Sequence, residues 1–323
     1  MALLEVKDMK VEIGPVTPID GVSFALDRGE ILGLVGESGS GKSLTAMAIM
    51  GLLPLSGGRV SAGSIRFDSI ELTQLSEHAY RALRGKRIAF ISQNPMTALD
   101  PLQAIGAQID VIGTLHFGKS AAQARHRTVD VLTQLRIPDA EAICRQYPHQ
   151  LSGGMKQRIV VAMALAGEPD IIIADEPTTA LDVTVQAQII HLLASLVRER
   201  GMALLLITHD MGVVAQCCDK VAVLYAGRLA EAAAIGPLFE VPAHPYTKAL
   251  IGCIPRAETP KGTLMGIPGT VPAVSAYPAG CRYHPRCPKA QDLCIRTVPA
   301  PAPRPEGVVA CHFPFLTDMC SDD

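Results

Sequence analysis

Long apolar runs are missing from this sequence. No stretch of its 323 residues reaches the roughly 18 uninterrupted apolar residues that a membrane-spanning helix needs. The first residues, MALLEVKDMKVEI, carry charges from the fifth position on, so we expect no signal peptide there. The sequence is therefore typical of a cytosolic protein and predicts no segment that crosses a bilayer.

An excess of positive charge is missing as well. The formal net charge is −2, and the basic residues form no long run. Because nucleic-acid-binding proteins neutralise phosphates with clustered Lys and Arg, we expect no nucleic-acid partner. Apolar residues make up 48% of the chain, which is typical of a globular protein with a real core.

The cysteines lack the pattern of a disulfide framework. Their number, nine, is odd, and the chain is long and unsecreted. They also contain no C-x₂-C pair of the kind that makes a metal site easy to recognise. The last 43 residues nevertheless hold Cys281, Cys287, Cys294, Cys311 and Cys320, beside the proline-rich stretch TVPAPAPRPEG. We interpret this region as a separate module.

The segment GESGSGKS matches the pattern G-x-x-x-x-G-K-S/T in full. It follows an apolar run at 31–35 that predicts a buried strand, and it precedes KSLTAMAIMGLL, which predicts a helix ending before Pro54. In this context the glycines turn backbone N–H groups toward phosphate oxygens, and the helix adds its positive end. Lys42 would then reach the β- and γ-phosphates, and Ser43 would bind Mg²⁺. The predicted binding set is Gly36, Glu37, Ser38, Gly39, Ser40, Gly41, Lys42, Ser43 and Leu44.

A second motif, PDIIIADEPTTALD, occupies residues 169–182. Its continuous apolar run predicts a strand that is buried on both faces. Asp175 stands at the carboxyl end of that strand, where open α/β sheets bind their ligands. It would hold Mg²⁺, and Glu176 would polarise an attacking water molecule. An isolated Asp-Glu pair would more simply be a solvated turn, but the phosphate loop upstream favours the catalytic interpretation.

Two further strands are predicted to end in polar residues. MALLLITHD predicts a strand at about 203–207 followed by His209, which would contact the γ-phosphate. RIAFISQNP predicts a strand ending in Gln93, whose amide would bond the metal and the water. Neither residue carries weight alone, since a lone histidine is more often a hydrogen-bonded structural residue.

A second glycine loop, LSGG, lies at 151–154 and precedes a good helical run. Ser152 can cap that helix, while Gly153 and Gly154 leave its N–H groups bare for an anion. One ATP does not need two such loops from one subunit. We therefore expect this loop to serve the ATP of a partner subunit.

The order of these motifs resembles that of the ATP-binding cassette (ABC) ATPases over residues 1–235. The resemblance implies an α/β P-loop NTPase fold with a RecA-like core, an antiparallel β subdomain and a helical subdomain at about 94–165. It also implies two cassettes that face head to tail, with each ATP between the phosphate loop of one and the LSGG loop of the other. One half-site would comprise Lys42, Ser43, Gln93, Asp175, Glu176 and His209, with Mg²⁺ held by Ser43, Gln93 and Asp175. The opposite half-site would comprise Ser152, Gly153 and Gly154, with Asp182 at the interface.

Longer segments resemble the ATPase subunits of oligopeptide, dipeptide and nickel importers. They are QNPMTALDPL, YPHQLSGGMKQR, HPYTKALIGCIP and GCRYHPRCP, so the likeness extends into a C-terminal extension at 236–323. It implies a second ABC ATPase of the same or a different kind, two transmembrane permease subunits and an extracytoplasmic solute-binding protein. It also implies a peripheral location at the cytoplasmic face of the bacterial inner membrane.

Peptides are the first expectation for the solute, with nickel or another small solute as the alternative. A non-transport ABC ATPase is the less favoured class. DNA-repair relatives insert a long coiled coil, whereas here only 109 residues separate Lys42 from Ser152. Ribosome-acting relatives carry two cassettes in one chain, and this chain has one.

Two features leave questions open. Ile13 stands where related cassettes carry an aromatic residue that stacks on adenine, so the nucleotide preference is not fixed by this position. Cys281, Cys287, Cys294 and Cys311 are separated by five, six and sixteen residues. Four thiolates would suit a [4Fe–4S] cluster or a zinc ion, and buried reduced thiols are the alternative.

Overall fold

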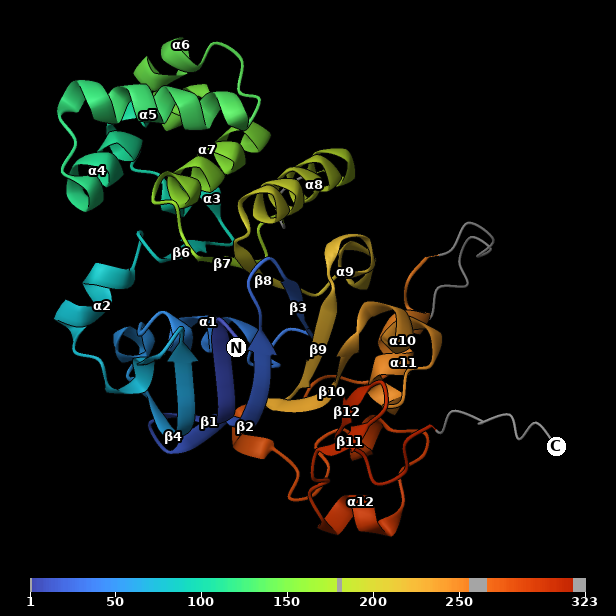
Figure 1. The fold of residues 1–323 in the computed structure, drawn as a ribbon. Helices are drawn as coiled ribbons and strands as arrows, with labels where there is room; N and C mark the ends of the chain where they lie inside the picture. The colour runs from blue at the N-terminus through green and yellow to red at the C-terminus, as the bar shows by residue number, and fades with distance from the viewer. Residues whose placement is uncertain (1, 179–181, 256–265, 316–323) are drawn as a thin grey trace. The chain divides into compact units, whose positions relative to one another are not determined.

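The chain groups in space into two units that are interleaved along the sequence. In the computed structural model, residues 2–178, 182–255 and 266–315 are described. Unit 1 comprises Met1–Leu3, Leu26–Ile31 and Gln74–Ile207, and unit 2 comprises Leu4–Ala25, Leu32–Thr73 and Thr208–Asp323 (Figure 1). The expected division of the chain at 235 and 236 does not coincide with either unit and stays a prediction.

Unit 1 contains three strands and most of the long helices. The elements are α2 (Glu77–Leu83), β6 (Ile88–Ile91), α3 (Pro95–Ala98), α4 (Ile105–Phe117), α5 (Ala121–Gln134), α6 (Ala140–Arg145), α7 (Gly153–Ala166), β7 (Ile171–Asp175), α8 (Val183–Arg200) and β8 (Ala203–Thr208). Strands β6, β7 and β8 are neighbours in that order and pair in parallel, with Ile171 opposite both Ile88 and Ala203. Every residue of β7 and β8 is buried, as expected for parallel strands covered on both faces.

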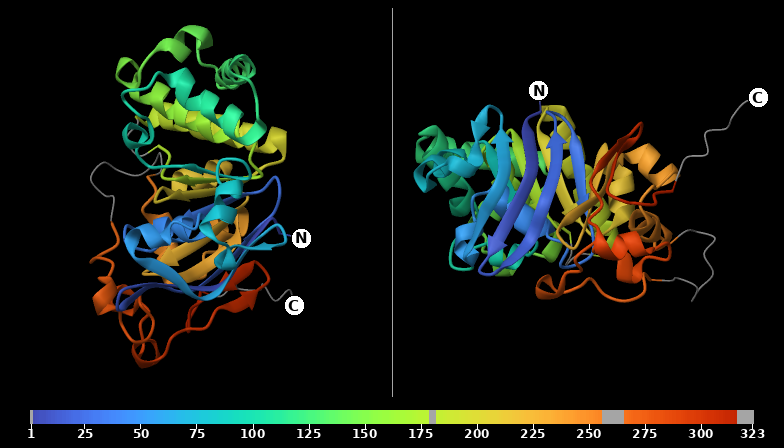
Figure 2. Two further views of the ribbon diagram at one scale, coloured as in Figure 1. Left: turned by 90° about the vertical axis from the view of Figure 1, so that its left-hand side faces the viewer. Right: turned by 90° about the horizontal axis from the view of Figure 1, so that it is seen from below.

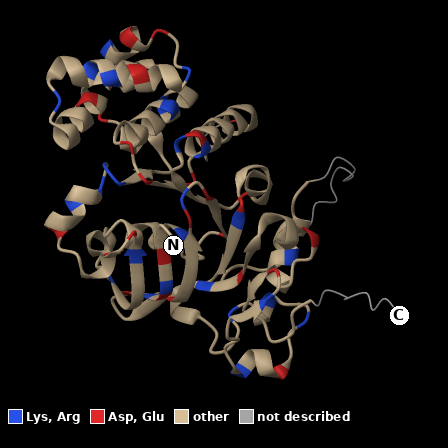
Figure 3. Ribbon diagram, in the orientation of Figure 1, with Lys and Arg blue, Asp and Glu red and all other residues tan. Residues whose placement is uncertain are grey.

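The helices α4 to α7 pack on one another and form a cluster (Figure 1). Helix α5 begins with a full capping box, in which Ser120 accepts from Gln123 N–H and the Gln123 side chain accepts from Ser120 N–H. Val131 and Leu132 are buried on its apolar face, so α5 is amphipathic. Basic and acidic residues are interspersed along this helix (Figure 3), in keeping with the net charge of −2.

Unit 2 contains an antiparallel sheet, a second sheet and the C-terminal extension. Its elements are β1 (Leu4–Ile13), β2 (Val16–Leu26), β3 (Ile31–Val35), α1 (Lys42–Ile49), β4 (Gly58–Phe67), β5 (Ile70–Glu71), α9 (Met211–Cys217), β9 (Lys220–Tyr225), β10 (Arg228–Ala234), α10 (Ile235–Glu240), α11 (Pro245–Gly252), α12 (Asp292–Arg296), β11 (Ala302–Arg304) and β12 (Gly307–Val309). The order β2-β1-β4-β5 gives the expected antiparallel β subdomain, whose long strands lie side by side in the right-hand view of Figure 2.

The second sheet of unit 2 runs in the order β11-β12-β10-β9-β3. Strand β3 pairs in parallel with β9, and β9 turns back into β10 through Ala226 and Gly227. Both turn residues have positive φ, 47° and 79°, which is the geometry of a tight type I′ hairpin. The extension then adds β12 beside β10 and β11 beside β12, so it continues the sheet.

One expected boundary is confirmed and one is wrong. Helix α1 ends before Pro54, at Ile49, because Gly51 has a φ of 64° and the chain enters a 3₁₀ turn at Leu53. Strand β6 ends at Ile91, so Gln93 lies two residues beyond the strand. Among the described residues, no helix has the length and the apolar content to cross a membrane.

Asp20 on β2 joins three basic residues of unit 2. It accepts from Arg228 at 2.6 Å, from Lys10 at 2.8 Å and from Arg282 at 3.3 Å. Burial alone would raise the pKa of Asp20, but the hydrogen bonds from Lys10 and Arg228 hold it down to about 2. A depressed pKa means that the ionised carboxylate stabilises the folded chain.

Replacing Asp20 by asparagine is expected to lower the free energy of unfolding by about 2 kcal/mol at pH 7. The benefit of a carboxylate with a lowered pKa is complete above its unfolded value near 3.8 and is lost as the pH falls toward about 2. The difference between the natural protein and Asp20→Asn should shrink over that window, as measured by urea unfolding at a series of pH values.

Glu12→Gln is the matched control, because Glu12 pairs with Arg59 at 2.8 Å while both side chains are exposed. It should leave the unfolding midpoint unchanged. Equal midpoints for Asp20→Asn and Glu12→Gln at pH 7 would show that the ion pairs of Asp20 stabilise the fold no more than an exposed ion pair does.

Candidate phosphate-binding and hydrolysis site

The phosphate loop in unit 2 connects β3 to α1 and is shaped by its glycines. A Cβ on Gly36 would lie 2.2 Å from the backbone oxygen of Leu224, so no larger residue fits there. Gly41 has a φ of 100°, which turns the chain into α1 in a conformation that disfavours other residues. The predicted strand–loop–helix context is present, and the α1 N-terminus opens at Lys42.

Lys42 folds back onto its own loop. Its ammonium group donates to the backbone oxygens of Gly36 at 2.7 Å and Glu37 at 3.0 Å, and the residue is 5% exposed. Ser43, one position further on, is exposed. The loop therefore holds one cation ready at its centre and one hydroxyl open to solvent, which suits a polyphosphate and a hard metal ion.

Unit 1 brings Gln93 and Glu176 together. The side-chain nitrogen of Gln93 donates to a carboxylate oxygen of Glu176 at 2.9 Å. Glu176 follows β7 with a φ of 45°, and its N–H donates to the Ile207 carbonyl at 2.9 Å. A non-glycine residue with positive φ is strained, and such strain gathers at functional sites. The backbone conformation of Glu176 and the side-chain amide of Gln93 thus fix the direction of the carboxylate. The same amide can also bind a water molecule.

The other predicted hydrolysis residues lie at strand ends. Asp175 is the last residue of β7 and is 8% exposed, opposite Ile207 of β8. His209 in unit 2 follows β8 directly and is exposed. Both positions agree with the expectation that polar residues stand at carboxyl ends of buried strands.

The LSGG loop lies in unit 1 at the N-terminus of α7. Ser152 caps the helix by accepting from Met155 N–H, as predicted, and Ser152 and Gly153 are exposed. A Cβ on Gly154 would lie 2.9 Å from Val185 of α8. Asp182 caps that same helix by accepting from Val185 N–H at 3.0 Å, so the structure brings Asp182 and the LSGG loop to one place.

The predicted cysteine metal site has no support from the geometry. Among the described residues, no group of three or more His, Cys, Asp or Glu side chains is placed to hold a metal ion. All eight described cysteines are free thiols, and burial raises the pKa of Cys281, of Cys287 and, to about 11, of Cys311. Cys320 lies outside the described residues. A cluster or zinc ion is therefore not part of the site described here.

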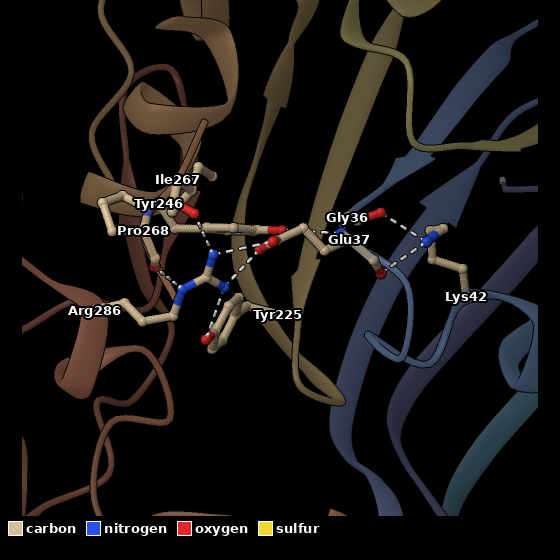
Figure 4. A network of polar contacts seen from close by, with 8 residues as sticks. All are labelled: Gly36, Glu37, Lys42, Tyr225, Tyr246, Ile267, Pro268 and Arg286. Atoms are coloured by element: carbon tan, nitrogen blue, oxygen red, sulfur yellow. Dashed lines mark hydrogen bonds and ion pairs between the residues drawn. The ribbon is translucent and has the colours of Figure 1, made fainter. Parts of the chain in front are cut away.

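Three residues near the phosphate loop were missed by the sequence analysis. The hydroxyl of Tyr246 accepts from Glu37 N–H at 3.0 Å, and Arg286 donates to the Glu37 carboxylate at 2.8 and 3.0 Å (Figure 4). Tyr225 lies against both, with its ring 4.7 Å from that of Tyr246. These partners lie about 190 to 250 positions along the chain from Glu37. Tyr246 and Arg286 stand in the segments HPYTKALIGCIP and GCRYHPRCP that carry the family resemblance, but no local pattern pairs them with Glu37.

Ile13 at the expected adenine position ends β1. It lies opposite Gly58 of β4, and a Cβ on Gly58 would lie 3.1 Å from its side chain. Ile13 is half-buried, which leaves part of an apolar surface. Its contact with a base stays a prediction.

Comparison with known proteins gives a consistent picture. Residues 19–179 match the model of the ABC transporter family, and residues 230–294 match the model of the oligopeptide/dipeptide transporter C-terminal region. The dipeptide transport ATP-binding protein DppD of Escherichia coli is 44% identical over 320 residues, which is 98% of each chain. The oligopeptide transport ATP-binding protein OppD of Salmonella typhimurium is 45% identical over 316 residues, 97% of this chain and 94% of that one.

Solved structures agree with these matches. A dimeric ATP-binding cassette in a post-hydrolysis state, bound to ADP and Pi, superimposes with a TM-score of 0.64 at 26% identity, covering 72% of this chain and 98% of the other. CbiO1 from Clostridium perfringens, part of an ABC transporter complex, gives a TM-score of 0.64 at 26% identity over 74% and 91% of the two chains. This chain is an ABC ATPase and belongs to the family of oligopeptide/dipeptide ABC transporter ATP-binding proteins.

Proposed function

We propose that this chain is the ATP-hydrolysing subunit that energises a peptide importer. The observation that carries the proposal is the similarity to dipeptide and oligopeptide transport ATP-binding proteins over almost the whole chain, C-terminal extension included. Under this proposal the protein works at the cytoplasmic face of the inner membrane as a peripheral subunit. It acts beneath two permease subunits that receive solute from an extracytoplasmic binding protein.

The phosphate loop, residues 36–44, binds the phosphates of ATP. Its backbone donors and Lys42 meet the negative charge, while Ser43, Gln93 and Asp175 supply the oxygen ligands that Mg²⁺ prefers. A metal ion held by these residues would supply positive charge opposite the phosphoryl oxygens. The oxygen-only donor set fits a hard cation and supports this assignment.

Glu176 acts as the general base that orients the attacking water. Its positive φ and its bond to Gln93 support this role, because both restrict where the carboxylate points. Gln93 holds the same water through its amide, and His209 contacts the γ-phosphate. Lys42 leaves the carbonyls of its own loop to stabilise the transferred phosphoryl group.

A second ABC ATPase completes the site. The exposed N-terminus of α7 at Ser152 and Gly153 is an anion site, and it serves the nucleotide of the facing subunit together with Asp182. Because ATP bridges the two subunits only when they close, ATP binding drives closure and hydrolysis releases it. The facing subunit is a related chain or a second copy of this one.

The segment from Gln93 to Leu102 transmits this closure to the permeases. Two large apolar side chains are unusually exposed there, Met96 at 60% and Leu102 at 85%. The ammonium group of Lys156 on α7 lies 3.2 Å from the sulfur of Met96, which links the segment to the helix that carries the LSGG loop. This link supports coupling of nucleotide state to permease position.

Glu176→Gln is expected to keep ATP binding and to reduce steady-state hydrolysis by about a hundredfold or more, since the amide cannot accept the proton from water. Phosphate release and binding of a fluorescent ATP analogue measure the two properties. Glu168→Gln, an exposed carboxylate of unit 1, is the control and should hydrolyse ATP normally. Normal turnover in Glu176→Gln would remove Glu176 as the base.

Ser152→Asp is expected to abolish ATP-dependent association of the two ATPase subunits. Aspartate still caps the helix, so folding is retained, but its charge repels the phosphates that the loop should bind. Light scattering with the second ATPase present, in a Glu176→Gln background, measures the association. Ser120→Asp, which alters the cap of the equally long helix α5, should associate normally. Equal association of both variants contradicts the role of the LSGG loop.

Leu102→Asp is expected to lower peptide uptake by the assembled transporter at least about tenfold while the isolated ATPase keeps its turnover. A charge in an apolar docking contact removes permease binding without touching the nucleotide residues. Leu55→Asp is the control, since Leu55 is equally exposed, at 83%, but lies in unit 2. Peptide uptake by proteoliposomes that contain the assembled transporter measures the effect. Unchanged uptake in Leu102→Asp would exclude this segment as the permease contact.

A further inference from the structure

Glu37 of the phosphate loop is held at three points, and two of them come from the C-terminal extension. Its N–H donates to the hydroxyl of Tyr246 at 3.0 Å. Its carboxylate accepts two hydrogen bonds from Arg286, at 2.8 and 3.0 Å. Its carbonyl accepts from Lys42 at 3.0 Å, so the residue that positions the phosphate-binding lysine is itself positioned by the extension (Figure 4).

The guanidinium group of Arg286 sits in a site built for it. The side chain is only 6% exposed. Besides Glu37, it donates to the backbone oxygens of Pro268 at 2.7 Å and Ile267 at 3.2 Å and to the hydroxyl of Tyr225 at 3.3 Å. Burial alone would lower the pKa of Arg286. The hydrogen bonds to Glu37 and Tyr225 outweigh this effect and raise the pKa above its ordinary value, so the group is charged. Only an arginine offers donors in this forked arrangement.

The pair places opposite charges beside an anion site. The Glu37 carboxylate is 30% exposed and belongs to the loop that must receive a polyphosphate. Without a counter-ion, this carboxylate would repel the phosphates at short range. Arg286 cancels that charge and, through the same two bonds, fixes the backbone that Lys42 contacts.

A second arginine of the extension holds the loop from another side. Arg282 is 8% exposed and donates to the carbonyl of Ala226 in the β9–β10 turn. The next turn residue, Gly227, donates its N–H to the Ser40 carbonyl of the phosphate loop at 2.9 Å. Arg282 thus stabilises the turn at Ala226, whose φ of 47° is strained. The same turn holds Ser40 through the N–H of Gly227.

We propose that Arg286 is a positioning residue of the nucleotide site, which neutralises Glu37 and fixes the phosphate loop, so that the C-terminal extension sets the affinity for ATP. The inference rests on the proposed role of residues 36–44 as the phosphate-binding loop. A purely mechanical role, in which the ion pair only fastens the extension to unit 2, makes a different prediction. Removing the Glu37 charge would then not repair the loss of Arg286.

The test uses the full-length chain with Arg286→Ala, Glu37→Gln and the double variant. Arg286→Ala should weaken binding of a fluorescent ATP analogue and raise the KM for ATP about tenfold, with kcat changed less than about threefold. The double variant should bind ATP within about threefold of Glu37→Gln, because the repelling carboxylate is gone. Glu37→Gln alone is the reference for the double variant, because it removes the same carboxylate while Arg286 stays in place.

The control is Arg296→Ala, an exposed arginine of the same extension, which should change neither constant. Should Arg286→Ala not fold, Arg286→Gln replaces it, since glutamine is neutral but keeps a donor group in place of a methyl group. Unchanged affinity in the Arg286 variant, or a double variant that binds ATP no better than Arg286→Ala, would overturn the proposal. A natural protein that binds no ATP, or whose binding survives Lys42→Ala, would instead overturn the proposed function.

Discussion

The phosphate loop works under one constraint: its backbone N–H groups have to face an anion, so the loop must be held by other groups. In this chain the support comes through carbonyls and side chains. Gly227 donates to the Ser40 carbonyl, Thr45 to that of Gly41, and Lys42 to that of Gly36. These three anchors hold the loop through its carbonyls and use none of its backbone donors. Two loop N–H groups are engaged elsewhere, that of Glu37 by the Tyr246 hydroxyl and that of Ser40 by the Glu37 carbonyl.

This constraint explains why distant segments gather around the loop. In the extension, His244 is the N-cap of helix α11, and its ring accepts a hydrogen bond from Tyr246 N–H at 3.0 Å. Burial lowers the pKa of His244 to about 4, so the ring is neutral and able to accept at physiological pH. Pro245 fits the first turn of the helix, and Tyr246 then points its hydroxyl at Glu37. The His-Pro-Tyr sequence thus starts helix α11 and places the hydroxyl of Tyr246 against the phosphate loop.

The sequence was sufficient wherever one segment contains its own physical reason. Strand β3 coincides with the predicted 31–35, and β7 and β8 agree with their apolar runs, because parallel strands buried on both faces need continuous apolar residues. Ser152 was predictable as a cap from its place before a helical run. The positive φ of Glu176 and the contacts of Arg286 were not predictable, since both depend on partners far along the chain. The end of α1 was expected before Pro54, and its exact place at Ile49 is set by the positive φ of Gly51.

The extension lies outside the residues that match the ABC transporter family model and has a family model of its own. The cassette structures align over about three quarters of this chain or less, whereas the peptide-transport relatives align over nearly all of it. The ABC transporter model covers residues 19–179, which include the phosphate loop, and a separate model covers 230–294, which include Arg286, so we expect the effect of the extension on the loop to be graded. Its leverage comes from electrostatics: Glu37 is repulsive toward phosphate when unpaired and neutral when paired. Any displacement of the segment that carries Arg286 consequently changes the charge beside the nucleotide, and the affinity for ATP follows the position of the extension.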